Sequence, residues 1–160
     1  MHTFTHLDSE GHARMVDVTQ KEPTVRSATA SGFVHCSPSV VAALREGTVP
    51  KGDALAVARV AGIAGAKRCP ELLPLAHVIT VHAVSVDLDV TDEGVAIEAT
   101  VKAHDRTGVE MEALTAVSVA SLALVDMVKG LDRSVSIGSI LLQEKTGGRS
   151  GTWRRDEAAR

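Results

Sequence analysis

Apolar and small residues run almost without interruption from Ala113 to Val125, and this run dominates the hydrophobic pattern of the chain. It predicts a long helix over residues 106–132 that is covered on most sides by a sheet, a second helix or another subunit. Charged side chains stand at both ends of this helix: Glu110 and Glu112 near its start, and Asp126 and Lys129 near its end.

Asp126 is the least expected of these charges. Its sequence neighbours on both sides are apolar, and an ionised carboxylate against an apolar surface costs several kcal/mol unless it is paired or hydrogen-bonded. A carboxylate in the last turn also opposes the helix dipole, whereas Lys129 is close enough in sequence to pair with it. The residue therefore needs either a structural or a chemical explanation.

Glu112 and Asp126 lie on one face of the predicted helix but far apart along it. At 100° per residue they are within about 40° of each other in azimuth, yet roughly 21 Å apart along the axis. Both cannot reach one small site from one helix. Either they serve different sites, or a symmetric oligomer brings the start of one helix near the end of another. For Glu110, a simple preference for the positive helix N-terminus remains open.

The remaining elements follow from alternating and helical patterns. Strands are predicted at 24–36, 78–90, 94–105 and 134–145, and two shorter helices at 38–46 and 53–67. Thr91–Gly94 is a hairpin signal between the second and third strands. The order strand, two helices, strand, strand, long helix, strand predicts an α+β fold of the ferredoxin-like β-α-β-β-α-β plan, with an antiparallel sheet and helices packed on one face.

Local signals refine these boundaries. Ser37 and Asp53 are placed to cap the two shorter helices, and Gly47 to end the first. Cys69–Leu75 contains two prolines, which predicts an irregular or extended segment. This segment delivers His77 to the start of the second strand, where it suits an acid, a base, a ligand anchor or a purely structural hydrogen bond.

Composition limits the classes of function. A chain of 160 residues, 44% hydrophobic, suits one domain; we predict a mobile arm at 1–20, a catalytic domain at 21–150 and a flexible tail at 151–160. With two Phe, one Trp, no Tyr and a net charge of −3, the chain lacks the stacking platforms and basic footprint of nucleic-acid binders. No secretory segment or membrane span is evident, so we expect a cytoplasmic protein without nucleic-acid or membrane partners.

Three further groups of residues are open to more than one interpretation. His2, His6 and His12 lack a second ligand cluster, so we predict no metal site. Lys51 stands beside a helix start and a glycine, which favours either an anion-binding corner or an ordinary loop lysine. Arg26 lies within the first predicted strand, where a solvated arginine is a simple alternative to a functional one.

Six runs of the sequence stand out together. They are MVDVT at Met15–Thr19, KGDALAVARVAGIAGAKR at Lys51–Arg68, LPLAH at Leu73–His77, TGVEMEALTAVSVASL at Thr107–Leu122, DMVK at Asp126–Lys129 and EKTGGRSG at Glu144–Gly151. In order and spacing they resemble the cyclic pyranopterin monophosphate synthases, the MoaC-type enzymes of molybdenum cofactor biosynthesis. The resemblance spans nearly the whole chain, and its TGVEMEALTA run is highly specific.

The resemblance implies both an assembly and a reaction. The family forms ferredoxin-like homohexamers, trimers of dimers, with active sites at subunit interfaces, which would bring Glu112 and Asp126 of different subunits together. It implies a lyase that converts (8S)-3′,8-cyclo-7,8-dihydroguanosine 5′-triphosphate, a small nucleotide substrate, into cyclic pyranopterin monophosphate plus pyrophosphate. No cofactor and no metal are expected.

Roles for individual residues also come from the resemblance. The implied catalytic residues are Lys51, His77, Asp126 and Lys129. The implied substrate-binding residues are Arg26, Leu75, Ala76, His77, Glu110, Met111, Glu112 and Lys145, with the cations holding the triphosphate. Such a set suits a reaction that needs proton donors and acceptors for ring opening and closure, and fixed cations for phosphate cyclisation and pyrophosphate departure.

The sequence departs from the family pattern in the LPLAHVI loop. Ala76 and Val78 stand where the family commonly has Cys or Thr and then Pro, so a catalytically weak paralogue is one alternative. A purine-nucleotide-binding ferredoxin-like sensor module is another. The presence of Lys51, Asp126 and Lys129 weighs against the sensor, because binding alone does not require acid–base groups.

Overall fold

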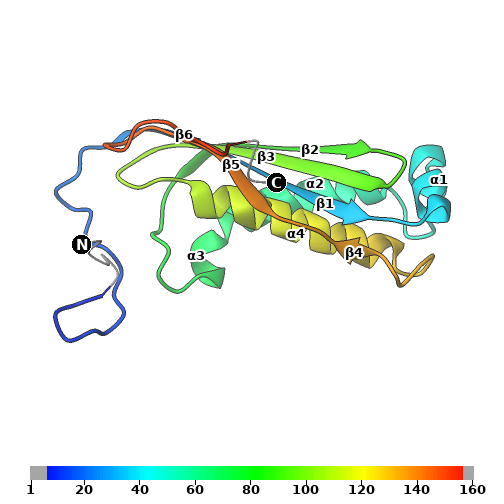
Figure 1. Ribbon diagram of the computed structural model, residues 1–160, viewed down its shortest axis with the longest axis horizontal. Coiled ribbons are helices and arrows are strands. Elements are labelled where there is room, and N and C mark those ends of the chain that lie inside the picture. The colour runs from blue at the N-terminus through cyan, green and yellow to red at the C-terminus, as the bar shows by residue number, and fades with distance from the viewer. Residues whose placement is uncertain (1–6, 157–160) are drawn as a thin grey trace.

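The computed structural model describes residues 7–156, in which an antiparallel sheet carries two long helices on one face (Figure 1). The strands are β1 (Thr24–His35), β2 (Val81–Val90), β3 (Gly94–Asp105), β4 (Ser136–Ile137), β5 (Leu141–Thr146) and β6 (Trp153–Arg154), and the helices are α1 (Pro38–Glu46), α2 (Ala54–Lys67), α3 (Cys69–Leu72) and α4 (Glu110–Val128). The strand order is β2-β3-β1-β5-β6. β4 pairs with the last two residues of β1, and β5 pairs with the earlier part of the same strand. This confirms the predicted α+β class and its ferredoxin-like connectivity.

The strands that form the middle of the sheet follow the predicted alternation. On β3, Val95, Ile97, Ala99 and Val101 are all buried, because side chains two positions apart point to the same face of a strand. On β2, which lies at the edge of the sheet, the pairing with β3 shifts between Val81 and Ala83, so the alternation is interrupted there. The hairpin between the two strands also forms as predicted.

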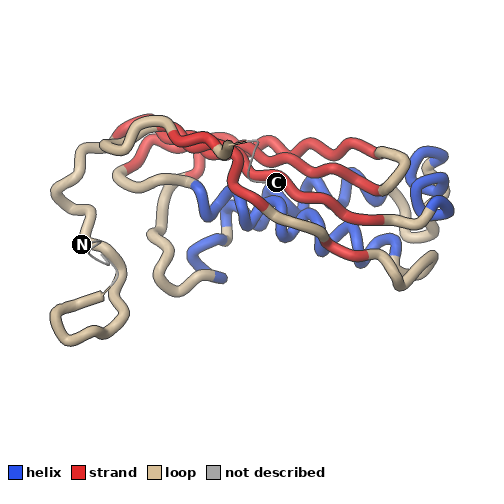
Figure 2. The backbone as a smooth tube through the Cα atoms, in the orientation of Figure 1, coloured by secondary structure: helices blue, strands red, loops and turns tan. Residues whose placement is uncertain are grey.

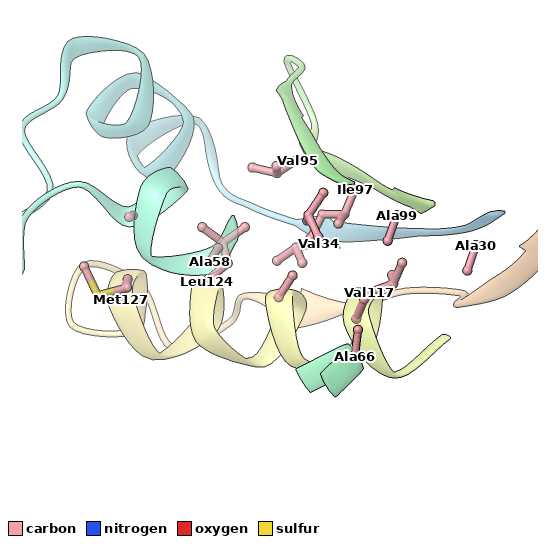
Figure 3. Close-up of a cluster of buried hydrophobic side chains, with 14 of the residues drawn as sticks. Ala30, Val34, Ala58, Ala66, Val95, Ile97, Ala99, Val117, Leu124 and Met127 are labelled. Atoms are coloured by element: carbon pink, nitrogen blue, oxygen red, sulfur yellow. The ribbon is translucent and has the colours of Figure 1, made fainter. Parts of the chain in front are cut away.

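The core lies between the sheet and the helix pair α2 and α4, which run side by side (Figure 2). It is made of aliphatic side chains, among them Val34 of β1, Ile97 of β3 and Leu124 of α4 (Figure 3). Because large aromatic side chains are lacking, the layers come close together. Gly62 lets α2 approach the backbone of α4 closely, since a Cβ there would lie 2.9 Å from the Ala116 carbonyl oxygen.

Replacing Gly62 with valine is expected to lower the free energy of unfolding by about 1–3 kcal/mol, the usual cost of overpacking a core. The added side chain would meet Ala116 and Ala120 of α4, so the two helices would have to separate. Chemical denaturation would measure the loss. Gly130→Ala is the matched control, because a Cβ at Gly130 meets no heavy atom within 4 Å; equal stability of both variants would show that α2 and α4 have room to spare.

α4 is long and apolar enough to cross a membrane by length and hydropathy alone. In the fold, however, its buried residues pack against α2, β1 and β3. An apolar helix covered on several sides by its own chain is the core helix of a soluble protein.

The segment that precedes β2 differs from its prediction. Cys69–Leu72 forms the helical turn α3, in which Pro70 occupies a first-turn position that needs no N–H donor. Irregular backbone begins only after this turn. β2 starts at Val81 rather than at residue 78, so His77 lies in the loop at 73–80 and not at the mouth of a strand.

Three other boundaries also differ. Ser37 precedes α1, but its hydroxyl contacts that of Ser39 and not a helix N–H; Asp53 does cap α2, by accepting from the Ala56 N–H. The last predicted strand is divided into β4 and β5. Beyond it, β6 pairs with β5, which adds a short strand within the segment predicted as a tail.

Candidate active site

The first group of candidate residues lies at the C-terminal end of α4. The Lys129 ammonium is 2.7 Å from one carboxylate oxygen of Asp126, and the Lys51 ammonium is 3.2 Å from the other. Lys51 also donates to the backbone carbonyl oxygen of Asp126 at 2.7 Å. The turn between α1 and α2 is thereby joined to the end of α4, and Lys51 completes one acid–base cluster with the neighbouring pair of Asp126 and Lys129.

Asp126 does not face an apolar surface, which corrects the expectation from its sequence neighbours. Its side chain is 56% exposed, because the flanking apolar residues point to other sides of the helix. Hydrogen bonds from Lys129 and Lys51 lower the pKa of the Asp126 carboxyl below its ordinary value. The group is therefore a carboxylate at neutral pH, held between two ammonium groups.

The anion-binding corner that Lys51 suggests is not formed at the start of α2. Its ammonium turns toward Asp126. The Asp53 carboxylate already accepts the hydrogen bond from the Ala56 N–H at that helix end. Its negative charge would repel a second anion there. Lys51 belongs to the α4 cluster instead.

The second group of candidates surrounds an open cavity of about 420 Å³ at the opposite end of α4. The cavity is lined by the N-terminal segment, the loop after α3 and the first turn of α4. Its lining residues are Val16, Val18, Lys21, Leu75, Ala76, His77, Thr107, Gly108, Glu110, Met111 and Glu112. All six residues that the resemblance assigns to this loop and helix start are brought together here.

His77 is oriented by the N-terminal segment. Its Nε2 atom is 2.7 Å from the carbonyl oxygen of Val16. A neutral imidazole bonded in this way donates through Nε2 and keeps Nδ1 as its proton acceptor. The loop histidine is thus held in one orientation at the cavity wall.

Glu112 is the buried acid of the cavity, with 3% of its surface exposed. Burial raises the pKa of its carboxyl, an effect that hydrogen bonds from its own backbone N–H and from Cys69 only partly offset. The Glu110 charge raises this pKa further, whereas His77 lowers it. A carboxyl with a raised pKa beside a cavity is suited to exchange protons with a ligand.

Arg26 and Lys145 lie beside a neighbouring basic cavity of about 510 Å³. The Arg26 guanidinium donates to the backbone carbonyl oxygens of Asp105 and Arg106, so it is not simply a solvated strand residue. The cavity is lined by Gln20, Lys21, Glu22, Thr24, Arg26, Gly148, Arg149 and Ser150. Lys21 borders both cavities, and Lys145 contacts Ser150 at this one. Cations therefore gather next to the cavity of Glu112 and His77.

Residue-by-residue reasoning missed part of these walls. Val16 and Val18 fall in the segment 1–20 predicted as an arm, and Lys21 follows it directly. The one signal for the N-terminal wall was the MVDVT run, since that segment has no periodicity of its own. His2 and His6 lie outside the described residues; within 7–156, no three His, Cys, Asp or Glu side chains are placed to hold a metal ion.

The chain by itself does not join the two groups. Glu112 and Asp126 are fourteen positions apart on the single helix α4, which places them roughly 21 Å apart along the axis. Figure 1 shows the consequence: the loop after α3 lies at one end of α4, and α1 with its following turn lies at the other.

Acid–base side chains, fixed cations and small open cavities on an α+β fold are typical of an enzyme of small-molecule metabolism. Residues 15–148 match the model of the MoaC family. The chain belongs to this family.

Similar proteins agree over most of their length. A protein of Streptomyces avermitilis is 60% identical over 152 residues, which cover 95% of this chain and 89% of that protein. A protein of Nocardioides sp. is 60% identical over 155 residues, covering 95% of each chain. One from Geobacter sulfurreducens is 51% identical over 158 residues, covering 97% of this chain and 98% of its own. Each is named cyclic pyranopterin monophosphate synthase.

Proposed function

We propose that this chain is a cyclic pyranopterin monophosphate synthase, a lyase of molybdenum cofactor biosynthesis that acts in the cytoplasm. It converts the cyclic dihydroguanosine triphosphate into cyclic pyranopterin monophosphate and releases pyrophosphate. The observation that carries this proposal is the near full-length similarity to synthases of that name. The acid–base cluster of Lys51, Asp126 and Lys129 supports it, because such a cluster serves turnover rather than binding.

The two ends of α4 have different proposed roles within the catalytic domain of residues 21–150. At the C-terminal end, the cluster around Asp126 transfers protons during ring opening and closure. At the N-terminal end, His77 acts as a further proton-transfer group, and the ring system is bound by Leu75, Ala76, Glu110, Met111 and Glu112. Arg26 and Lys145 hold the triphosphate, since guanidinium and ammonium groups form strong bonds to phosphate oxygens.

We further propose that the complete site forms between subunits of a homohexamer, a trimer of dimers. An outward stripe on α4 supports this: Met111, Leu114, Ser118, Leu122 and Val125 follow helical spacing and are partly or fully exposed. Ser118 stands at the middle of the stripe. Two copies of α4 packed antiparallel about Ser118 would place Asp126 of each near Glu112 of the other.

Replacing Leu122 with glutamate is expected to lower kcat/KM at least about tenfold and to reduce the oligomer mass measured by light scattering. Leu122 is 60% exposed in the single chain, so the monomer tolerates the charge, but burying it unpaired in an interface costs several kcal/mol. Ala42→Glu, at an exposed position of α1, is the matched control. An unchanged hexamer with Glu at 122 would place the interface elsewhere.

One assay separates the proposed function from its alternatives. The enzyme is supplied with the cyclic dihydroguanosine triphosphate, and pyranopterin and pyrophosphate are measured. The proposal expects stoichiometric release of both products. Binding without pyrophosphate release would identify a sensor module, and turnover far below that of a similar synthase would identify a weak paralogue.

The LPLAHVI loop is where a weak paralogue would differ. Ala76 lines the cavity, whereas Val78 is 87% exposed. The lack of a proline at position 78 therefore leaves the loop backbone more flexible and does not change the packing. Measuring kcat for Val78→Pro would test whether this loop limits the rate.

A further inference from the structure

The N-terminal wall of the cavities, residues 15–22, is held by two side chains from distant parts of the sequence. The Nε2 atom of His77 is 2.7 Å from the Val16 carbonyl oxygen. The Nε atom of Arg106 donates to the Lys21 carbonyl oxygen at 2.9 Å. Among the residues that the structure describes, the other hydrogen bonds of 7–22 stay within that segment. The hydrogen-bonded placement of this wall therefore depends on His77 and Arg106.

Arg106 stands in the turn between β3 and α4 and bonds to both basic neighbours of the cavities. Its backbone N–H donates to the Asp105 carboxylate at 2.7 Å. Its backbone carbonyl oxygen accepts a hydrogen bond of 3.2 Å from the Arg26 guanidinium. Arg106 thus bonds the Lys21 backbone through its side chain and the Arg26 side chain through its backbone. Because Lys21 lines both cavities and Arg26 lines the basic one, Arg106 joins their walls.

We propose that Arg106 is a positioning residue of the site: its guanidinium holds the N-terminal wall against the turn before α4 and keeps Lys21 at the border of the two cavities. The side chain acts through this wall and not on a ligand, because Arg106 lines neither cavity. Residues 14–23 belong to no helix or strand, so the wall has no backbone ladder of its own to the sheet. The statement that the cavities bind substrate rests on the proposed function, whereas the hydrogen bonds do not.

Hydrogen exchange of the full chain, followed by mass spectrometry, measures the wall directly. Arg106→Met puts a methyl group in place of Nε, and residues 15–22 are expected to exchange about fivefold faster, the scale of one lost hydrogen bond. Arg106→Gln carries its amide nitrogen the same number of bonds from the backbone as Nε. It keeps the donor without the charge and should restore slow exchange.

Arg45→Met is the matched control for loss of an arginine. Arg45 also donates to a distant backbone carbonyl, that of Val90, but at the end of the fold where α1 lies (Figure 1). Exchange of residues 15–22 should stay at the wild-type rate in this variant.

Kinetics on the same variants test the functional half. Arg106→Met is expected to raise KM about fivefold and to keep kcat within about twofold, because a displaced wall weakens binding without removing an acid–base group. Gln should return KM close to the wild-type value. Arg106→Lys keeps the charge but carries its donor one bond further out, so it should recover less than Gln.

Two results would overturn the proposal. Recovery of KM by Lys but not by Gln would assign the effect to the charge of Arg106 and not to its hydrogen bond. Wild-type exchange and KM in Arg106→Met would show that the wall holds without this residue. If exchange is faster in Arg106→Met but the wild-type chain makes no pyranopterin, the proposed function fails and the role of Arg106 in holding the wall stands.

Discussion

Replacing Asp126 with asparagine is expected to lower kcat at least about a hundredfold, with substrate affinity nearly unchanged. One general acid–base residue typically contributes a factor of this size. Asparagine keeps the size of the side chain and its hydrogen-bond acceptor for Lys129, but it cannot carry a proton. Single-turnover kinetics measure the chemical step directly, and thermal denaturation of the same variant measures any structural effect.

In the proposed mechanism, the two lysines beside Asp126 set the direction of its first proton transfer. Lys129 and Lys51 lower the pKa of its carboxyl, so it is ionised in the resting enzyme at neutral pH and accepts a proton before it can donate one. Asp132→Asn is the matched control, because that exposed carboxylate bonds the Ser134 N–H near the same helix end. A folded, fully active Asp126→Asn would remove the residue from the mechanism.

Mixing two inactive variants is expected to restore about a quarter of wild-type activity if sites are shared between subunits. Asp126→Asn disables one end of α4 and His77→Ala disables the other. When equal amounts are dissociated and reassembled at random, about one site in four receives both intact ends from different subunits. Steady-state turnover before and after reassembly measures the recovery, which starts from near zero.

Two controls make this experiment decisive. Asp126→Asn mixed with Lys129→Ala should not recover, because both residues belong to the same cluster and no pairing of subunits restores it. Mixing without dissociation should also fail if subunits exchange slowly. No recovery in the mixture of Asp126→Asn and His77→Ala after reassembly, with hexamers confirmed by light scattering, would mean that each chain holds a complete site of its own.

The regular helices and strands are predictable because a buried face makes apolar residues recur at the fixed interval of the strand or helix. The buried alternation of Val95, Ile97 and Ala99 fixes a strand whichever partner it pairs with, and the apolar run of α4 requires cover on several sides. The order of the six motifs along the chain likewise indicates the family, and through it Arg26, His77 and Glu112 as residues of the site.

What the sequence could not supply depends on tertiary placement. The exposure of Asp126 follows from its azimuth relative to the sheet, and flanking apolar residues mislead because neighbours in a helix point 100° apart. α3 forms although its segment contains two prolines, since Pro70 occupies a first-turn position that needs no donor and Pro74 lies beyond the end of the helix. The wall made by Val16 and Lys21 has no period to detect, because a segment that lies along a cavity repeats no core-facing pattern.

The uninterrupted helix α4 also limits which insertions and deletions the protein can accept. Fourteen positions between Glu112 and Asp126 amount to nearly four turns, so both residues stay on one side of the helix. Inserting or deleting one residue between them would rotate one end by about 100° against the other and turn a wall of the site into the core. Substitutions along this segment can be tolerated, whereas insertions and deletions cannot. We therefore expect the helix to keep the same number of residues in relatives whose surface loops differ in length.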